Sequence, residues 1–87
     1  MGSKTFDGVW FIAYTKDHLP PHVHGKYAET TVILEILRKE REVRVANRID
    51  AIQPPNAKRS DVKKILKVAA EHAEDLIKLW EAVHGSL

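Results

Sequence analysis

Thr30–Leu37 reads TTVILEIL, and this run decides how the rest of the chain can fold. It is rich in β-branched residues and too short for a typical helix, so it predicts a largely apolar β-strand. Two more strands are predicted before it: residues 9–16 (VWFIAYTK), which are apolar on both faces, and His22–Tyr27 (HVHGKY), which alternate. After it, residues 38–42 (RKERE) form a charged turn, and residues 42–46 (EVRVA) alternate as a half-buried strand.

The C-terminal part of the chain predicts one long helix. Residues 47–56 form a loop that contains a proline pair, and residues 57–84 carry apolar side chains at steps of three and four. These side chains make one stripe: Val62, Ile65, Leu66, Ala69, Ala73, Leu76, Ile77, Trp80 and Val83. We therefore expect a single α+β domain over residues 1–87, with a small antiparallel sheet of about four strands over residues 6–46 and the helix packed on one face (ββββα). The other face would be poorly covered, which favours a homodimer or a cognate partner protein.

Composition limits the classes of function. The chain has 87 residues, 44% of them hydrophobic and 30% charged, which is typical of one folded domain. Its formal net charge of +2 is too small to indicate nucleic acid binding by itself. The absence of cysteine excludes a disulfide framework, a thiolate metal site and a cysteine nucleophile. No apolar run approaches the roughly 20 residues of a membrane span, and no signal-peptide pattern opens the chain, so we expect a cytoplasmic protein.

Three of the five histidines lie within residues 17–24 (DHLPPHVH). His22 and His24 are two positions apart on a predicted strand, so they project from the same face with Cα atoms about 6.5 to 7 Å apart. His18 precedes a rigid proline pair, which lowers the entropy cost of holding it near them. His72 lies within the apolar stripe of the predicted helix and is expected to face the sheet, where a histidine needs a hydrogen-bond partner or an ion. The sequence therefore predicts a site around His18, His22 and His24, with His72 facing it.

Three interpretations of this cluster stay open from the residues alone. Neutral imidazoles can bind zinc or another divalent metal, and the ligands here would be His18, His22 and His24, with Asp17 or His72. Alternatively, two of the histidines act as general base and general acid, because histidine titrates near neutrality. Lys16, Lys26 or Tyr14 would then bind a phosphate, and the reaction would be RNA strand cleavage. In the third interpretation the histidines only hydrogen-bond one another and the backbone, and they fix the loop against the helix.

Aromatic and basic side chains elsewhere have simpler interpretations. Four rings lie in a predicted strand or on the apolar stripe and are expected in the core: Trp10, Phe11, Tyr14 and Trp80. One end of the predicted helix has a basic face made of Lys58, Arg59, Lys63, Lys64 and Lys67. Such a face is usually solvated surface, and contact with nucleic acid or an acidic partner is the alternative.

These residues resemble a bacterial family known only as domain of unknown function 4160. Members of that family carry an aromatic residue and a glycine, an apolar strand that ends in tyrosine, a D-H-x-P-P-H-x-H run and a lysine–tyrosine pair. The matching residues here are Phe6, Gly8, Tyr14, Asp17, His18, Pro20, Pro21, His22, His24, Lys26 and Tyr27. The family's pattern in the terminal helix is matched by Ala69, Glu71, His72, Glu74, Leu76 and Trp80. The middle departs from the pattern, because residues 43–56 are longer than the family's short connection.

The resemblance covers most of the chain, and it implies a fold and a setting more than an activity. Family members look like one half of a two-gene toxin–antitoxin-type module, beside a small partner of another uncharacterised family. By that resemblance this chain would bind a cognate protein, and an RNA-directed activity would be plausible. A non-catalytic protein-interaction module with structural histidines is the alternative.

Overall fold

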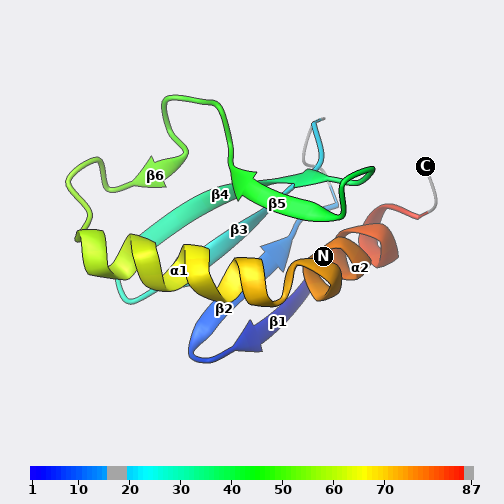
Figure 1. Ribbon diagram of the computed structural model, residues 1–87, viewed down its shortest axis with the longest axis horizontal. Coiled ribbons are helices and arrows are strands. Elements are labelled where there is room, and N and C mark those ends of the chain that lie inside the picture. Colours follow the sequence, from blue (N-terminus) through cyan, green and yellow to red (C-terminus); the bar gives the residue numbers. More distant parts are fainter. Residues whose placement is uncertain (16–19, 86–87) are drawn as a thin grey trace.

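The structure is a computed structural model that describes residues 1–15 and 20–85. In these residues, strands form the N-terminal part and two helices the C-terminal part (Figure 1). The strands are β1 (Gly2–Phe6), β2 (Val9–Ala13), β3 (His22–Tyr27), β4 (Thr30–Leu37), β5 (Glu42–Val45) and β6 (Ile52–Gln53). The helices are α1 (Arg59–Glu71) and α2 (Ala73–His84), and neither is long and apolar enough to cross a membrane. The expected α+β class with an antiparallel sheet is confirmed.

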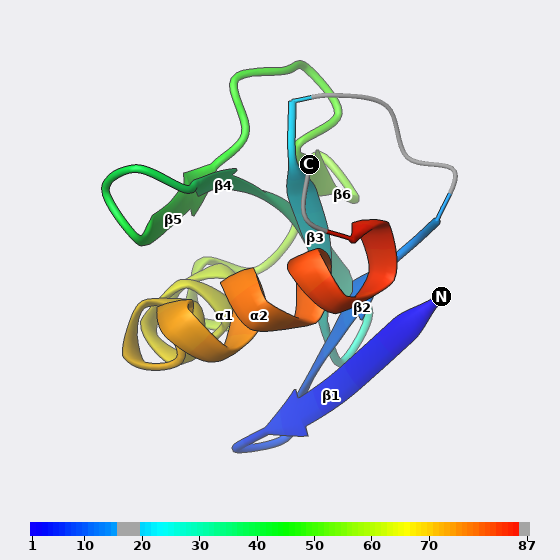
Figure 2. The same ribbon diagram turned by 90° about the vertical axis from the view of Figure 1, so that its right-hand side faces the viewer.

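The sheet is an antiparallel meander in which β1 to β5 lie side by side in chain order. One edge of β4 is shared by two partners, since β5 pairs with residues 34–37 and β6 with residues 31–32. Between these two pairings, the backbone of Ile33 donates to the carbonyl of Ala51 (2.7 Å) and accepts from the amide of Ala46 (2.9 Å). Residues 46–51 therefore form a loop that is closed at both ends against β4, and Figure 2 shows this connection on the side of the sheet away from the helices.

Both helices cover the same face of the sheet (Figure 2). The core between the two layers is made of Val9, Phe11, Ala13, Val23, Val32, Leu34, Ile36, Ile65, Val68, Ala69, Leu76, Ile77, Leu79 and Trp80. Gly25 allows the close approach of α1, because a Cβ atom there would lie 2.9 Å from Cγ2 of Ile65 and 3.1 Å from Cε1 of Phe11. Side chains alternate along a strand, so Val23 and Gly25 face the helices while their neighbours on β3 face the other way. We call this second side, which the helices do not cover, the open face.

The prediction of about four strands is too low. The four predicted strands are present, and β1 and β6 are added to them. β1 is an edge strand with an exposed, polar centre, so it shows none of the apolar alternation on which a strand prediction depends. Its signal is the turn that follows: Asp7 and Gly8 both have positive φ angles, 49° and 84°, as a two-residue hairpin of the Asp-Gly kind requires. β6 has only two residues, too few for any pattern.

The prediction of one long helix over residues 57–84 is wrong. His72 has φ −116° and ψ 27°, outside the helical range, and it separates α1 from α2. Hydrogen bonds continue on both sides of the break, since the His72 amide donates to the carbonyl of Val68 and the His72 carbonyl accepts from the amide of Leu76, both at 3.0 Å. The apolar stripe also continues through the break, which is why periodicity could not reveal it. The change of direction lets α2 pack mainly against β1, with further contacts to β2 and β5, while α1 packs mainly against β3, β4 and β5.

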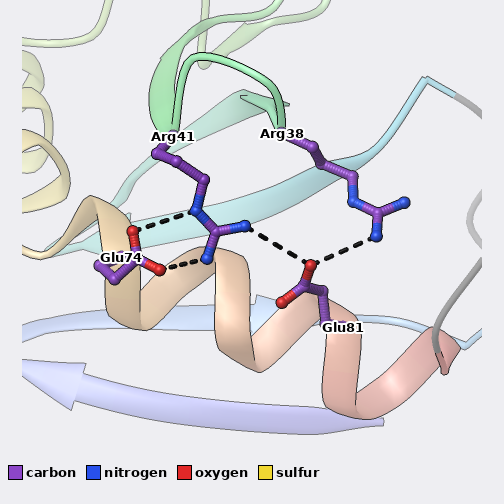
Figure 3. A network of polar contacts seen from close by, with 4 residues as sticks. All are labelled: Arg38, Arg41, Glu74 and Glu81. Carbon is purple, nitrogen blue, oxygen red and sulfur yellow. Dashed lines mark hydrogen bonds and ion pairs between the residues drawn. The ribbon is translucent and has the colours of Figure 1, made fainter.

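An ion-pair network ties the turn between β4 and β5 to α2 (Figure 3). Arg41 donates to Glu74 through two nitrogens and lies 3.6 Å from the carboxylate of Glu81, which also accepts from Arg38 at 3.3 Å. The Arg38 guanidinium in addition lies over the ring of Trp80, 5.2 Å from its centroid. The hydrogen bonds between Arg41 and Glu74 raise the pKa of the arginine and lower the pKa of the carboxyl. The network is largely solvent-exposed, and its role is to hold the hairpin over the helix.

Candidate functional site

The structure brings His22 and His24 together on the open face. Both extend from β3 on the side opposite Val23 and Gly25, as the two-residue spacing predicts. Their ring centroids are 5.3 Å apart and the ring planes are inclined by 60°. Two imidazoles at this separation can act on one bound group. We call them the histidine pair.

His22 is held in one orientation by its own chain. It is only 7% exposed, and its Nδ1 lies 2.9 Å from the carbonyl oxygen of Pro20. A carbonyl oxygen can only accept, so Nδ1 carries the hydrogen and Nε2 carries the lone pair in the neutral ring. Directly across the strand pairing stands Glu35, whose carboxylate accepts a hydrogen bond from Arg44 at 3.2 Å. His22 is therefore an oriented imidazole whose Nε2 is the basic atom.

His24 is half-buried between two apolar neighbours. The pairing places it between Ile12 of β2 and Ile33 of β4, both of which are buried although they belong to the open face. The ring of Tyr14 meets the His24 ring edge-on, with centroids 5.1 Å apart and planes at 84°. These three contacts fix where the imidazole of His24 can lie.

The carboxylate of Asp50, in the loop 46–51, interacts electrostatically with His24. Asp50 forms an ion pair with Arg48, whose Nη2 donates to Oδ2 at 2.8 Å. This hydrogen-bonded guanidinium is the main cause that lowers the pKa of Asp50, and the charge of His24 contributes in the same direction. Each member of the histidine pair thus has an acidic neighbour, Glu35 for His22 and Asp50 for His24.

The rest of the predicted cluster divides into two groups. Asp17 and His18, together with Lys16, lie outside the described residues. His72 is described, and the structure does not place it with the histidine pair. It stacks on Phe6 (centroids 4.0 Å apart, planes at 11°) on the helix side of the sheet. Its Nδ1 lies 3.3 Å from Asp75 and its Nε2 lies 3.8 Å from Asp7. His72 does face the sheet, as periodicity predicts, but it faces β1 at the turn before β2, where a break in the helix directs it.

A divalent metal would need ligands beyond the described part of the chain. Within residues 1–15 and 20–85, no three histidine, aspartate or glutamate side chains are grouped so that they could hold an ion. The histidine pair supplies two imidazoles, and zinc in proteins takes at least three protein ligands. A metal at this pair would therefore have to draw on Asp17 or His18.

Two of the four rings expected in the core are on the surface. Phe11 and Trp80 are buried, as predicted, but Trp10 is 42% exposed and Tyr14 is 38% exposed. Trp10 belongs to β2 and points to the open face, and Tyr14, which follows the end of β2, places its ring beside His24 on the same face. The mistake came from treating β2 as a strand covered on both sides, whereas the helices cover only one.

Three polar residues near the pair were missed. Glu35 had a signal, because it is the only charged residue in an apolar strand and shares a face with positions 31 and 33. Arg48 and Asp50 had none, because only the pairing of β6 with β4 returns their loop to the sheet.

A family model matches residues 8–81, and its description is domain of unknown function, DUF4160. The matched range includes β2 to β6, α1 and most of α2, and therefore the histidine pair, Tyr14 and Asp50. No match was found among curated proteins or among solved structures. By the extent of the matched range, the chain belongs to the family of domain of unknown function DUF4160.

Proposed function

We propose that this chain is the RNA-directed component of a two-protein, toxin–antitoxin-type module in the bacterial cytoplasm, and that the histidine pair is its acid–base site. The observation that carries the proposal is the pair itself: two imidazoles 5.3 Å apart on the one face of the sheet that the helices leave open. The module follows from the family resemblance, and the site follows from the chemistry of the residues.

The different surroundings of the two rings favour different roles. His22 presents the lone pair of Nε2, because Nδ1 donates to the Pro20 carbonyl, so it is suited to be the general base. His24, whose ring centroid is 5.3 Å from that of His22, is then the general acid. A base and an acid that act on the same phosphate are what RNA cleavage without a metal requires.

The reaction then balances as an internal transesterification. His22 takes the proton of a ribose 2′-hydroxyl, and the 2′-oxygen attacks the adjacent phosphorus. The bond from phosphorus to the 5′-oxygen of the next nucleotide breaks, and His24 gives its proton to that oxygen. The products are a 2′,3′-cyclic phosphate and a free 5′-hydroxyl. Lys26, two positions beyond His24 on the same face of β3, is placed to neutralise charge on the phosphate.

The test uses purified protein and a DNA strand that contains a single ribonucleotide. We expect cleavage only at the ribonucleotide, with a 2′,3′-cyclic phosphate on the product. The substitutions His22→Asn and His24→Asn should each slow the cleavage about 100- to 10,000-fold, the usual contribution of one acid or base. His84→Asn is the matched control, because His84 stacks on Trp80, on the helix side of the sheet, and should leave the rate unchanged.

Three results would overturn the proposal. Equal cleavage by the wild type and His24→Asn would indicate a contaminating nuclease. Loss of activity in chelator, with recovery on addition of zinc, would favour a metal site that includes Asp17 or His18. Loss of folding in both histidine variants, seen by circular dichroism, together with no cleavage by the wild type, would favour a protein-interaction module in which the histidines are structural.

A further inference from the structure

Trp10 lies in a polar row that crosses the open face. The strand pairings place Thr5 of β1, Trp10 of β2, Lys26 of β3 and Thr31 of β4 side by side. Among the described residues no aromatic ring stacks on Trp10, and the ammonium of Lys26 lies over its ring, with Nζ 5.9 Å from the centroid. An exposed indole with a cation beside it, in a row with a threonine at each end, is a surface on which a planar ring can stack while a phosphate contacts the cation.

Lys26 also supplies the uncompensated charge of this part of the open face. It forms no ion pair with the described residues, whereas Arg44 is paired with Glu35 and Arg48 with Asp50. The row therefore has a net positive charge at the position next to the histidine pair. An anionic ligand is favoured there by simple Coulomb attraction.

The exposed rings do not form the continuous apolar patch that a protein partner prefers. The large hydrophobic side chains most exposed in the described chain are Met1, Trp10, Tyr14 and Ile49. Tyr14 lies just beyond the end of β2, the buried Ile12 lies between it and Trp10, and the neighbours of Trp10 on the adjacent strands are Thr5 and Lys26. The core of a protein interface is depleted of charge and closely packed. This row instead contains a lysine and an exposed indole. An exposed ring with a cation beside it is typical of single-strand nucleic acid recognition.

We infer that the open face binds single-stranded RNA, with a base stacked on Trp10 and the adjacent phosphate at Lys26; this rests on the proposed function and names the form of its substrate. His24 lies two residues along β3 from Lys26. The phosphate that is cleaved at His24 would therefore lie about 7 Å from the phosphate that Lys26 binds. A duplex is excluded because its bases are already stacked on one another and cannot lie on Trp10. Stacking on an indole accepts any base, so selection of sequence at this position is weak.

The experiment measures binding separately from cleavage. A short 2′-O-methyl RNA cannot be cleaved through its 2′-oxygen, and it is titrated into the protein while tryptophan fluorescence and the anisotropy of an end label are recorded. Trp10 is 42% exposed and Trp80 only 2%, so a stacked base quenches the emission of Trp10 alone. We expect Trp10→Ala to weaken binding roughly 5- to 100-fold, and Trp10→Phe to restore most of the loss because a ring remains.

Lysine variants test the phosphate contact. Lys26→Gln should weaken binding and lower the salt slope, the change of log K with log salt, by about 0.7, the value for one phosphate on a single strand. Lys78→Gln is the matched control, because Lys78 is an exposed lysine of α2, on the other side of the sheet, and should change neither quantity.

Three outcomes separate this inference from the acid–base proposal and from a dimer interface. Equal affinity for the single strand and its duplex, or unchanged affinity in Trp10→Ala, overturns the inference even if the protein cleaves RNA. Tight single-strand binding that depends on Trp10, without cleavage by any preparation, supports the inference and overturns the acid–base proposal. A wild-type dimer that Trp10→Ala converts to a monomer, with no RNA binding by either, shows that the face binds a second copy of the chain and overturns the inference.

Discussion

Replacing Gly25 by alanine tests the close contact between β3 and α1. The added Cβ would lie 2.9 Å from Ile65 and 3.1 Å from Phe11, and both neighbours are fully buried, so neither can move into solvent. Overpacking of a core costs about 1–3 kcal/mol. In the absence of a clash, alanine would instead stabilise a strand by about 0.5–1 kcal/mol relative to glycine. Because the overpacking cost is the larger, we expect Gly25→Ala to lower the free energy of unfolding.

The assay is urea denaturation followed by circular dichroism, with a double-mutant cycle as its control. Ile65→Ala removes the Cγ2 atom that the new Cβ would meet, at a cost of about 2–5 kcal/mol for the cavity. The double variant should then lose less than the sum of the single losses, by more than about 0.5 kcal/mol. A Gly25→Ala variant as stable as the wild type, or losses that simply add, would refute the reasoning.

Three further predictions concern the scaffold. Gly8→Ala should lower stability by about 1–2 kcal/mol in thermal unfolding, because Gly8 has a φ of 84° that alanine adopts with strain; an unchanged melting temperature would contradict this. Since Arg41 lowers the pKa of Glu74, the contribution of this carboxylate is present above its ordinary pKa of 4.5 and is lost as pH falls through the lower folded value. Urea stability of the wild type should therefore decline more steeply than that of Glu74→Gln below about pH 4.5, and parallel curves would count against the ion pair. His72→Ala should remove the stacking on Phe6 and lower the free energy of unfolding by about 0.5–1.5 kcal/mol more than the loss of buried area alone. The measurement is urea denaturation, and an unchanged free energy of unfolding would show that the stack does not contribute.

Local patterns were enough to predict the middle of the sheet. β3 and β4 have the bounds that alternation and β-branched content predict, and the shared face of His22 and His24 follows from the two-residue period of a strand. The features that were missed depend on other information. β1 is polar because it lies at an edge, and only the Asp7-Gly8 turn indicates it.

The surroundings of the histidine pair depended on tertiary structure. His72 has the periodicity of a sheet-facing residue, but which strand it faces is decided by the helix break at its own position, and the apolar stripe hides that break. The approach of Asp50 to His24 requires a loop that is closed by β6 on β4, a pairing between segments about twenty residues apart. Trp10 and Tyr14 are exposed because two helices on one face leave the other open, which the pattern of β2 alone does not show.

The pH dependence of cleavage gives the most direct measurement of the acid–base pair. With a single-ribonucleotide substrate, the rate at saturating substrate is measured across neutral pH for the wild type, His22→Asn and His24→Asn. One base and one acid predict a bell-shaped profile for the wild type. Loss of the base in His22→Asn should remove the acidic limb, and loss of the acid in His24→Asn should remove the alkaline limb. A profile that rises steadily with pH, or the same bell in all three proteins, would contradict the assignment of His22 and His24.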